Sequence, residues 1–367
     1  MNIKNRKKVL FIIPSLDIGG TENICKTLFI ELSKNIDLKI ELLILNKNRK
    51  NNFYNDIESN FKENIFFSKH RNWFYISILL TKLIYFRDYS SIFCFNAETA
   101  LIINIIKKLS IKKTKIIFRV NNSIKNKIYN LNNYIRARLI YIYHLISLQM
   151  SDIIIVQSFQ MKSEIKDIIK SDHKIKVIYN TLSNKFSKDK SNFKKGSYLL
   201  FVGSFKPKKN PLMILKIYNQ FIKNHKTKIT LKMVGSGEEI RKIKKFIKEN
   251  NLKNKVELIK PLSQNKLQLL YSKALCLVIS SKYEGFPNVA IESLFCGTPL
   301  LAYKGIGGIN ELIENKTNGI IVSSYSINSY LEGLKMLLKI KFDRSKIINT
   351  SNKFNTNNLV QSYADIF

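Results

Sequence analysis

Residues 280–299 constrain this chain most, because they read as the end of a strand, a short loop and a helix in immediate succession. Residues 275–280, LCLVIS, are apolar and partly β-branched, which is typical of a strand that is buried on both faces. Pro287 is favourable in a first helical turn, and Gly297, with a proline two residues later, is a helix-stop signal. We therefore predict a helix from about Pro287 to Cys296.

Two carboxylates flank the start of this predicted helix. Glu284 lies in the loop at the carboxyl end of the strand, and Glu292 lies more than one turn inside the helix. The free N–H groups of a helix start attract a phosphate, and a carboxylate one turn further accepts hydrogen bonds from hydroxyls such as those of a ribose. A solvated surface helix is the commoner explanation for an isolated pair of acids. The arrangement as a whole predicts a sugar-nucleotide site.

The segment EGFPNVAIESLFCGTPLLA, residues 284–302, closely resembles the signature of group 1 (family 4) glycosyltransferases. The resemblance implies an α/β GT-B fold, with two Rossmann-like doubly wound domains that face a central cleft. It also implies that the C-terminal domain holds a nucleoside diphosphate sugar. Glu292 would then hold ribose hydroxyls and Glu284 hydroxyls of the donor sugar. The phosphate would meet the helix start at Gly285, Phe286 and Asn288.

Length and charge narrow the function classes. The chain has 367 residues, which is enough for two domains that each bury a core. Its net charge is +36, but the excess is spread evenly over both halves and accompanies frequent Lys, Asn and Ile. We interpret most of it as compositional bias rather than as a basic groove. Without a recognisable nucleic-acid module, a nucleic-acid-binding protein is the less favoured class.

The four cysteines are scattered, with no metal-binding or redox spacing, and are expected to be buried thiols. The basic start leads into an apolar stretch that is too short for a signal peptide, so we expect a cytoplasmic protein. No apolar run reaches about 18 residues, so no membrane span is predicted.

The N-terminal half opens with a predicted strand at 9–15, a glycine pair and a helix. This is a Rossmann-like beginning, in which glycine lets the backbone approach a ligand. An ordinary strand–helix turn would look the same. Similar loops in the resembling family lie across from the diphosphate of the donor, which makes Gly20 a donor-binding candidate.

Further strands are predicted near 38–45, 64–68, 91–95, 115–120, 152–157 and 175–179. Loops at the carboxyl ends of parallel strands face the crevice of such a sheet, so they are the candidates for acceptor contacts. They contain Asn96, Glu98 and Asn121. Many family members have a histidine where Asn96 and Glu98 stand, and this chain departs from that pattern. Glu98 contacts the acceptor or caps the following helix, and none of the four histidines is assigned to catalysis.

A lysine-rich polar segment, residues 181–196, predicts the interdomain linker. The strand YLLFVGS that follows ends at Gly203 and Ser204, and the next loop resembles the family's phosphate loop. Lys209 matches the lysine that neutralises the diphosphate, whereas serine stands at 204 where arginine is usual. Lys206 or Lys208 could replace that arginine, although solvated lysines are common in such loops.

The strand ITLKMV leads into Gly235 and Gly237, which resemble the family's turn beside the nucleotide base. The last residues resemble the terminal helix that returns to the first domain in this fold. We therefore predict an acceptor-side domain at 1–190, a nucleotide-sugar-binding domain at 191–352 and a returning helix at 353–367.

These features predict a glycosyltransferase that moves a sugar from a nucleoside diphosphate sugar to a saccharide or lipid-linked acceptor in cell-surface polysaccharide biosynthesis. Lys209 would offset the charge that grows on the leaving diphosphate. The resemblance implies retention at the anomeric carbon, with no metal or other cofactor required. A sugar-nucleotide epimerase of the same fold is the main alternative.

The segment RNWFYISILLTKLIYFRDY, residues 71–89, combines aromatic and aliphatic side chains with Arg71, Lys82 and Arg87. It is too short to cross a bilayer, but such a helix can lie among lipid headgroups. The alternative is a core helix of the first domain. With its charge, the protein is expected to bind anionic membranes peripherally at their cytoplasmic face.

Overall fold

The computed structural model describes residues 6–16, 19–46, 61–69, 72–129, 133–182 and 196–367. The chain divides into two compact units. Unit 1 comprises residues 1–183 and 356–367, and unit 2 comprises residues 184–355. Most of the predicted linker lies outside the described residues.

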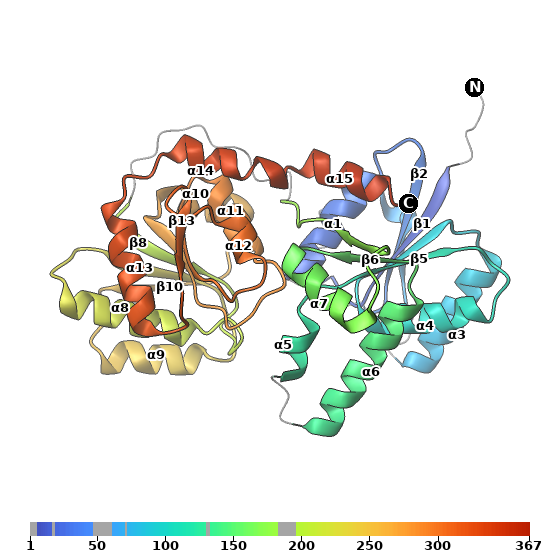
Figure 1. Ribbon diagram of the computed structural model, residues 1–367, viewed down its shortest axis with the longest axis horizontal. Helices are drawn as coiled ribbons and strands as arrows, with labels where there is room; N and C mark the ends of the chain where they lie inside the picture. Colours follow the sequence, from blue (N-terminus) through green and yellow to red (C-terminus); the bar gives the residue numbers. More distant parts are fainter. Residues whose placement is uncertain (1–5, 17–18, 47–60, 70–71, 130–132, 183–195) are drawn as a thin grey trace. The chain divides into compact units, whose positions relative to one another are not determined.

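The described part of unit 1 is built on a seven-stranded parallel sheet in the order β3-β2-β1-β4-β5-β6-β7 (Figure 1). Its strands are β1 Lys7–Ile13, β2 Leu38–Ile44, β3 Ile65–Phe67, β4 Ser91–Cys94, β5 Lys115–Arg119, β6 Ile153–Val156 and β7 Ile175–Val177. The helices are α1 Gly20–Leu32, α3 Trp73–Phe86, α4 Ala97–Lys108, α5 Ile124–Tyr129, α6 Tyr134–Met150, α7 Phe159–Ile169 and α15 Thr356–Ala364, with a short 3₁₀ turn, η2 Lys62–Asn64.

Helices cover both faces of this sheet, as the apolar character of its strands requires. Leu10 and Ile12 of β1 belong to one buried cluster, with side chains of α3, α4, α6 and α7. Val9, Phe11 and Ile13 point to the opposite face and pack with α1 and α15. Because side chains alternate along a strand, a wholly apolar strand fills two cores at once.

The C-terminal helix α15 packs within unit 1. Its Tyr363 and the following Phe367 are buried, and the ring of Phe367 lies 5.7 Å from that of Phe93 between centroids. The Tyr363 hydroxyl also accepts a hydrogen bond from Arg119 Nε at 3.4 Å. The last helix therefore completes the core of the first unit.

The described part of unit 2 has a six-stranded parallel sheet in the order β10-β9-β8-β11-β12-β13. Its strands are β8 Tyr198–Val202, β9 Thr230–Val234, β10 Val256–Ile259, β11 Cys276–Ile279, β12 Leu300–Tyr303 and β13 Gly319–Val322. The helices are α8 Pro211–Asn224, α9 Ile240–Glu249, α10 Gln264–Lys273, α11 Asn288–Phe295, α12 Ile309–Leu312, α13 Ile327–Lys339 and α14 Arg344–Thr350, with a 3₁₀ turn, η3 Asn352–Phe354.

Both sheets reverse their strand order at one point, which fixes where ligand-binding loops gather. In unit 1 the reversal lies between β1 and β4, and in unit 2 between β8 and β11. In open parallel sheets, the crevice outside the carboxyl ends of the strands at such a point is the usual ligand site. The fold is therefore α/β with two doubly wound sheets, and the predicted strands are confirmed to within about two residues.

Candidate functional site

The predicted donor-side residues meet at the reversal point of unit 2. Lys209 lies in the loop after β8 and Glu284 in the loop after β11, and these two strands pair directly. Lys209 Nζ donates a hydrogen bond to Glu284 Oε1. The two residues, 75 positions apart in sequence, form one ion pair at the carboxyl edge of the sheet.

Glu284 is buried and remains a carboxylate. Its Oε1 also accepts a hydrogen bond of 2.7 Å from Ser281 Oγ, and the ammonium of Lys208 lies 3.9 Å from Oε2. Burial alone would raise the pKa of Glu284, but the charges of Lys209 and Lys208, with the hydrogen bonds, outweigh it and lower the pKa below its usual range. The loop thus holds a fixed negative charge between two cations.

The structure distinguishes the two lysines that could replace the missing arginine. Lys208 is half-buried, its ammonium lies 5.0 Å from the centroid of the Tyr283 ring, and burial lowers its pKa against the attraction of Glu284. Lys206 is exposed to solvent. Ser204 is half-buried in the same loop. The second cation beside Glu284 is therefore Lys208.

Glu292 lies on α11 and contacts a residue that the sequence did not single out. Tyr271, at the end of α10, donates a hydrogen bond of 2.8 Å from its hydroxyl to Glu292 Oε2. Removal from water raises the pKa of Glu292, which the Tyr271 hydrogen bond and the charge of Lys209 oppose. The part-exposed carboxylate therefore keeps hydrogen-bonding capacity close to the cations.

The start of α11 differs by one residue from the prediction. Pro287 has φ −79° and ψ 101°, so it is the N-cap residue, and the first helical residue is Asn288. Gly285 and the buried Phe286 precede it in the loop. Gly297 follows the helix with φ +69°, the left-handed conformation expected of a helix stop. The helix N-terminus therefore opens directly behind Glu284.

The remaining glycines of unit 2 allow loops to pack closely. A Cβ atom on Gly235 would lie 2.0 Å from the carbonyl oxygen of Gly203, and one on Gly237 would lie 2.5 Å from that of Phe205. A Cβ on Gly307 would lie 2.2 Å from the carbonyl oxygen of Glu284. These contacts join the loops after β8, β9, β11 and β12 by their backbones, so larger residues would separate them.

Gly20 is the first residue of α1, in unit 1. Gly19 is the N-cap residue and makes no side-chain cap. The structure thus places the glycine pair at a helix N-terminus at the carboxyl edge of the first sheet.

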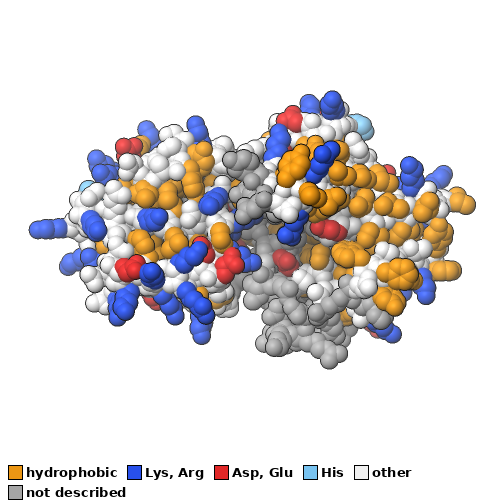
Figure 2. Space-filling model, turned by 90° about the horizontal axis from the view of Figure 1, so that it is seen from below, with side chains coloured by type: hydrophobic (Ala, Val, Ile, Leu, Met, Phe, Trp, Pro, Cys, Tyr) orange, Lys and Arg blue, Asp and Glu red, His pale blue; other side chains and the backbone are white. Residues whose placement is uncertain are grey.

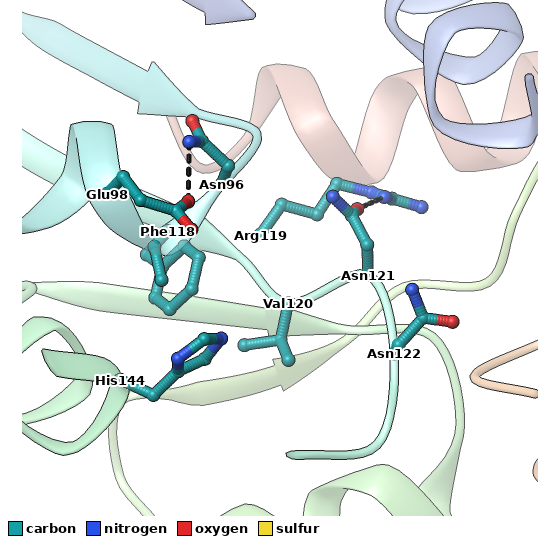
Figure 3. A pocket seen from close by; sticks show the side chains of 9 residues that line it. Asn96, Glu98, Phe118, Arg119, Val120, Asn121, Asn122 and His144 are labelled. Atoms are coloured by element: carbon teal, nitrogen blue, oxygen red, sulfur yellow. Dashed lines mark hydrogen bonds between the residues drawn. The ribbon is translucent and has the colours of Figure 1, made fainter. Parts of the chain in front are cut away.

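The acceptor-side candidates line one pocket in unit 1, at the ends of β4 and β5 (Figure 3). Its volume is about 140 Å³. The wall is made by Asn96, Ala97, Glu98, Phe118, Arg119, Val120, Asn121, Asn122 and His144.

Glu98 is fixed in this wall by two neighbours. Asn96 Nδ2 donates to Glu98 Oε2 at 2.7 Å, as Figure 3 shows, and the Tyr143 hydroxyl donates to Glu98 Oε1 at 2.9 Å. Burial, together with the Glu98 carboxylate, raises the pKa of Tyr143, which keeps its hydroxyl protonated. His144 follows on the same helix, and its Nδ1 lies 2.8 Å from the carbonyl oxygen of Ile140. Sequence reasoning set His144 aside, but α6 carries it into the pocket.

Arg119 and Asn121 form the other part of the wall. The guanidinium of Arg119 is buried and donates to the side-chain oxygens of Asn121 and Asn180. Asn121 in turn donates to the carbonyl oxygen of Phe95. Asn96, Glu98 and Asn121 are thus brought together by β4, β5 and α6.

The residues that sequence reasoning missed are Ser281, Tyr271, Tyr143, His144 and Asn122. They lie outside recognisable motifs, and only their contacts with motif residues identify them. Among the described residues, no group of three or more His, Cys, Asp and Glu side chains is placed to hold a metal ion. The four cysteines are buried and free.

Comparison with known proteins adds a family and relatives. Residues 183–354 match the family model described as "Glycosyl transferases group 1". An uncharacterized glycosyltransferase of Methanocaldococcus jannaschii is 28% identical over 208 residues, which cover 57% of this chain and 55% of the relative. The matches to the first relatives thus span about half of those proteins.

One relative aligns almost throughout. It is the Campylobacter jejuni enzyme named GalNAc-alpha-(1->4)-GalNAc-alpha-(1->3)-diNAcBac-PP-undecaprenol alpha-1,4-N-acetyl-D-galactosaminyltransferase, which is 24% identical over 94% of this chain and 92% of its own length. Among solved structures, Anabaena Alr3699/HepE in complex with UDP and glucose superposes with a TM-score of 0.76 at 15% identity, covering 98% of this chain and 99% of the other.

At that identity, the structural likeness establishes the fold alone, which is GT-B. The family match adds chemistry for the C-terminal part of the chain. Together these findings support a glycosyltransferase of the GT-B fold, with residues 183–354 as its group 1 glycosyl transferase domain.

Proposed function

We propose that this protein transfers a sugar from a nucleoside diphosphate sugar to a saccharide or lipid-linked acceptor in the synthesis of cell-surface polysaccharide. The observation that carries the proposal is the cluster of Lys208, Lys209, Glu284 and Glu292 at the reversal point of the second sheet. Two cations, two carboxylates and a helix N-terminus are the groups that a sugar nucleotide needs.

Each member of the cluster has a task in this proposal. Glu292 accepts hydrogen bonds from the ribose hydroxyls, and Tyr271 fixes its orientation through the 2.8 Å hydrogen bond. Glu284 accepts from hydroxyls of the donor sugar. The backbone N–H groups at Gly285, Phe286 and Asn288 meet the phosphates, as helix N-termini commonly do.

The two lysines act on the leaving group. When the bond between the anomeric carbon and the phosphate oxygen breaks, the electron pair stays on the diphosphate, and Lys209 and Lys208 stabilise that charge. The acceptor hydroxyl forms the new bond and gives its proton to the leaving phosphate oxygen. The resemblance to a retaining family favours retention at the anomeric carbon. In this scheme the lysines do the work for which a metal would otherwise serve.

The pocket of unit 1 is the proposed acceptor site. Its walls offer amide, carboxylate and imidazole groups from Asn96, Asn121, Glu98 and His144, which suit the hydroxyls of a sugar. The Campylobacter relative carries an undecaprenol diphosphate in the name of its acceptor, which supports a lipid-linked saccharide here. The Anabaena protein was solved with UDP, which supports a nucleotide donor.

The test is an assay of nucleoside diphosphate release from a panel of nucleotide sugars, with and without short saccharide and polyprenyl diphosphate saccharide acceptors. We expect release from one donor that depends on an acceptor. Release by Glu284→Gln should fall by about tenfold or more, since a charge-assisted hydrogen bond is worth about 1.5–3 kcal/mol. No release from any donor with any acceptor would contradict the proposal.

The same assay tests the epimerase alternative. An epimerase converts the donor without an acceptor, so a new sugar nucleotide in the acceptor-free reaction would favour it. Glu332→Ala is the matched control, because Glu332 is an exposed acid on α13 of the same unit. Its release rate should equal that of the unaltered protein.

A further inference from the structure

Helix α3 has a narrow buried stripe and a wide exposed apolar face. Ile76, Leu80 and Ile84, spaced four residues apart, are its buried side chains. Phe74 and Phe86 are 67% and 84% exposed. The exposed side of a helix on a soluble core is normally polar. The stripe explains why the helix packs on the sheet, and it leaves the opposite face unexplained.

Helix α6 repeats this pattern. Ile135, Leu139, Ile142 and Ile146 are all exposed and follow one another at spacings of four, three and four residues. That spacing places them on one side of the helix. The buried residues of α6 include His144 and lie on other positions. A second helix of unit 1 thus carries an apolar stripe on its outer side.

Helix α4 connects the two stripes. It contacts both α3 and α6, and beyond its end Leu109 and Ile111 are almost fully exposed. The Tyr85 hydroxyl of α3 donates to the carbonyl oxygen of Leu109 at 2.9 Å, which holds this end against α3. In Figure 2, hydrophobic side chains gather over the part of unit 1 that these helices form in Figure 1. We call this the α3–α6 surface. It is larger than scattered exposed residues would produce.

The charge of the α3–α6 surface has one sign. Neither α3 nor α6 contains an Asp or Glu. Exposed cations accompany the apolar residues: Lys82 on α3, Lys108 at the end of α4, Lys113 beyond it, and Arg136 and Arg138 on α6. Acidic side chains next to this surface are Asp88, paired with Lys112, and Asp152, paired with Lys107. The surface therefore combines aromatic and aliphatic groups with a positive excess.

We propose that the α3–α6 surface docks on a bilayer that contains anionic phospholipid, with α3 and α6 lying in the headgroup region. Aromatic and aliphatic side chains enter that region, and each nearby basic residue attracts the anionic lipid. A second copy of this chain fits less well, because a twofold interface would bring equal positive charges together. Among the described residues, no helix is long and apolar enough to cross the bilayer.

The docked α6 also relates the surface to the pocket, a point that rests on the proposed function. Leu139 lies in the exposed stripe and His144 in the pocket wall, five residues or about 7.5 Å apart along the helix axis. The head of a lipid-linked acceptor can therefore reach the pocket while its carrier stays in the bilayer. Sugar transfer to a polyprenyl diphosphate acceptor in vesicles would then be faster than transfer to its water-soluble counterpart.

The docking itself is tested without donor or acceptor, by cosedimentation with vesicles of phosphatidylglycerol mixed with phosphatidylcholine and with vesicles of phosphatidylcholine alone. We expect binding to the anionic vesicles that weakens with added salt but persists in part. Equal and negligible binding to both at low salt would overturn the proposal. Because no sugar nucleotide is present, this result is independent of whether the enzyme assay succeeds.

Two pairs of variants assign the binding to this surface. Phe74→Ser with Leu139→Ser should abolish the part that persists at high salt. The matched control is Leu269→Ser with Met336→Ser, at exposed positions of unit 2, and it should bind as the unaltered protein does. Equal losses in both pairs would overturn the location.

The second pair tests the charge. Arg136→Glu with Arg138→Glu should weaken binding to anionic vesicles by roughly tenfold or more at low salt. Arg241→Glu with Lys244→Glu makes the same charge change on exposed positions of α9 and should have a much smaller effect. A stable dimer in light scattering, dissociated by the Phe74 and Leu139 changes, would assign the surface to a second copy and overturn the proposal.

Discussion

The two candidate binding regions of the molecule are built in opposite ways. In unit 2, two neighbouring loops supply charged side chains, with Glu284 held between Lys208 and Lys209. In unit 1, three elements supply mostly neutral groups around a pocket, and its carboxylate, Glu98, is held by an amide and a phenol. Charge is compensated by charge in the first region and by hydrogen bonds in the second.

This difference suggests how the two regions divide the work. A cluster of full charges binds and stabilises phosphate strongly but discriminates little among sugars. A pocket of hydrogen-bonding groups with fixed directions rejects a ligand that leaves one of them unpaired. We therefore expect changes in unit 2 to affect the rate strongly, and changes in unit 1 to affect acceptor use more selectively.

The largest effect is expected for Lys209→Ala. It removes the cation that contacts Glu284 and would offset charge on the leaving diphosphate. Loss of such an interaction costs about 1.5–3 kcal/mol, or about one to two powers of ten in kcat/KM. Steady-state kinetics with the identified donor would measure it.

Two neighbouring lysines serve as comparisons for that variant. Lys206 is exposed, so Lys206→Ala should stay near the rate of the unaltered protein, whereas Lys208→Ala should fall between the two. If Lys209→Ala turns over normally and Lys206→Ala does not, the assignment of the two cations is wrong.

A smaller and more selective effect is expected in the pocket of unit 1. Tyr143→Phe removes the hydroxyl that fixes Glu98, while Tyr141→Phe makes the same change at an exposed position of α6. We expect the KM for the acceptor to rise by roughly three- to tenfold in Tyr143→Phe, because a net hydrogen bond is worth about 1 kcal/mol. The KM for the donor should not change. A rise confined to the donor would place this pocket on the donor side.

The smallest effects concern stability, and the two carboxylates should differ in sign. The lowered pKa of Glu284 stabilises the fold above its unfolded-state pKa, and this stabilisation is lost as the pH falls through the folded-state pKa. Glu284→Gln should therefore lower the Tm at neutral pH by roughly 3–8 °C, and the difference should shrink in acid.

Glu292 has a raised pKa, so its contribution is favourable below its unfolded-state pKa and is lost as the pH rises through the folded-state pKa. Glu292→Gln keeps an acceptor for the Tyr271 hydroxyl. It should raise the Tm at neutral pH by roughly 1–3 °C. Thermal unfolding at several pH values would measure both variants, and a lower Tm for Glu292→Gln at neutral pH would contradict the account.

Much of the fold follows from local patterns. Strands such as β4 and β11 are short apolar runs that cannot be satisfied outside a covered sheet, and the helix after Glu284 is delimited by Pro287 and Gly297. The one-residue error at Pro287 arises because proline fixes φ but leaves ψ free, so it fits the N-cap as well as the first turn.

The candidate site was predictable only where its residues share a motif. Glu284 and Glu292 stand on one segment, so their spacing places them. Tyr271 and His144 come from other helices, and nothing local distinguishes them from core residues. The exposure of α3 was also undecidable, because an apolar helix packs a core or a membrane equally well until its neighbours are known.

The central claim is that unit 2 holds the nucleotide through Glu292 while unit 1 does not. Isothermal titration of UDP and GDP into the unaltered protein, Glu292→Ala and Glu98→Gln tests it most directly. We expect one nucleotide to bind, with its Kd at least tenfold higher in Glu292→Ala and unchanged in Glu98→Gln. Unchanged affinity in Glu292→Ala, or loss of affinity in Glu98→Gln alone, would contradict the claim.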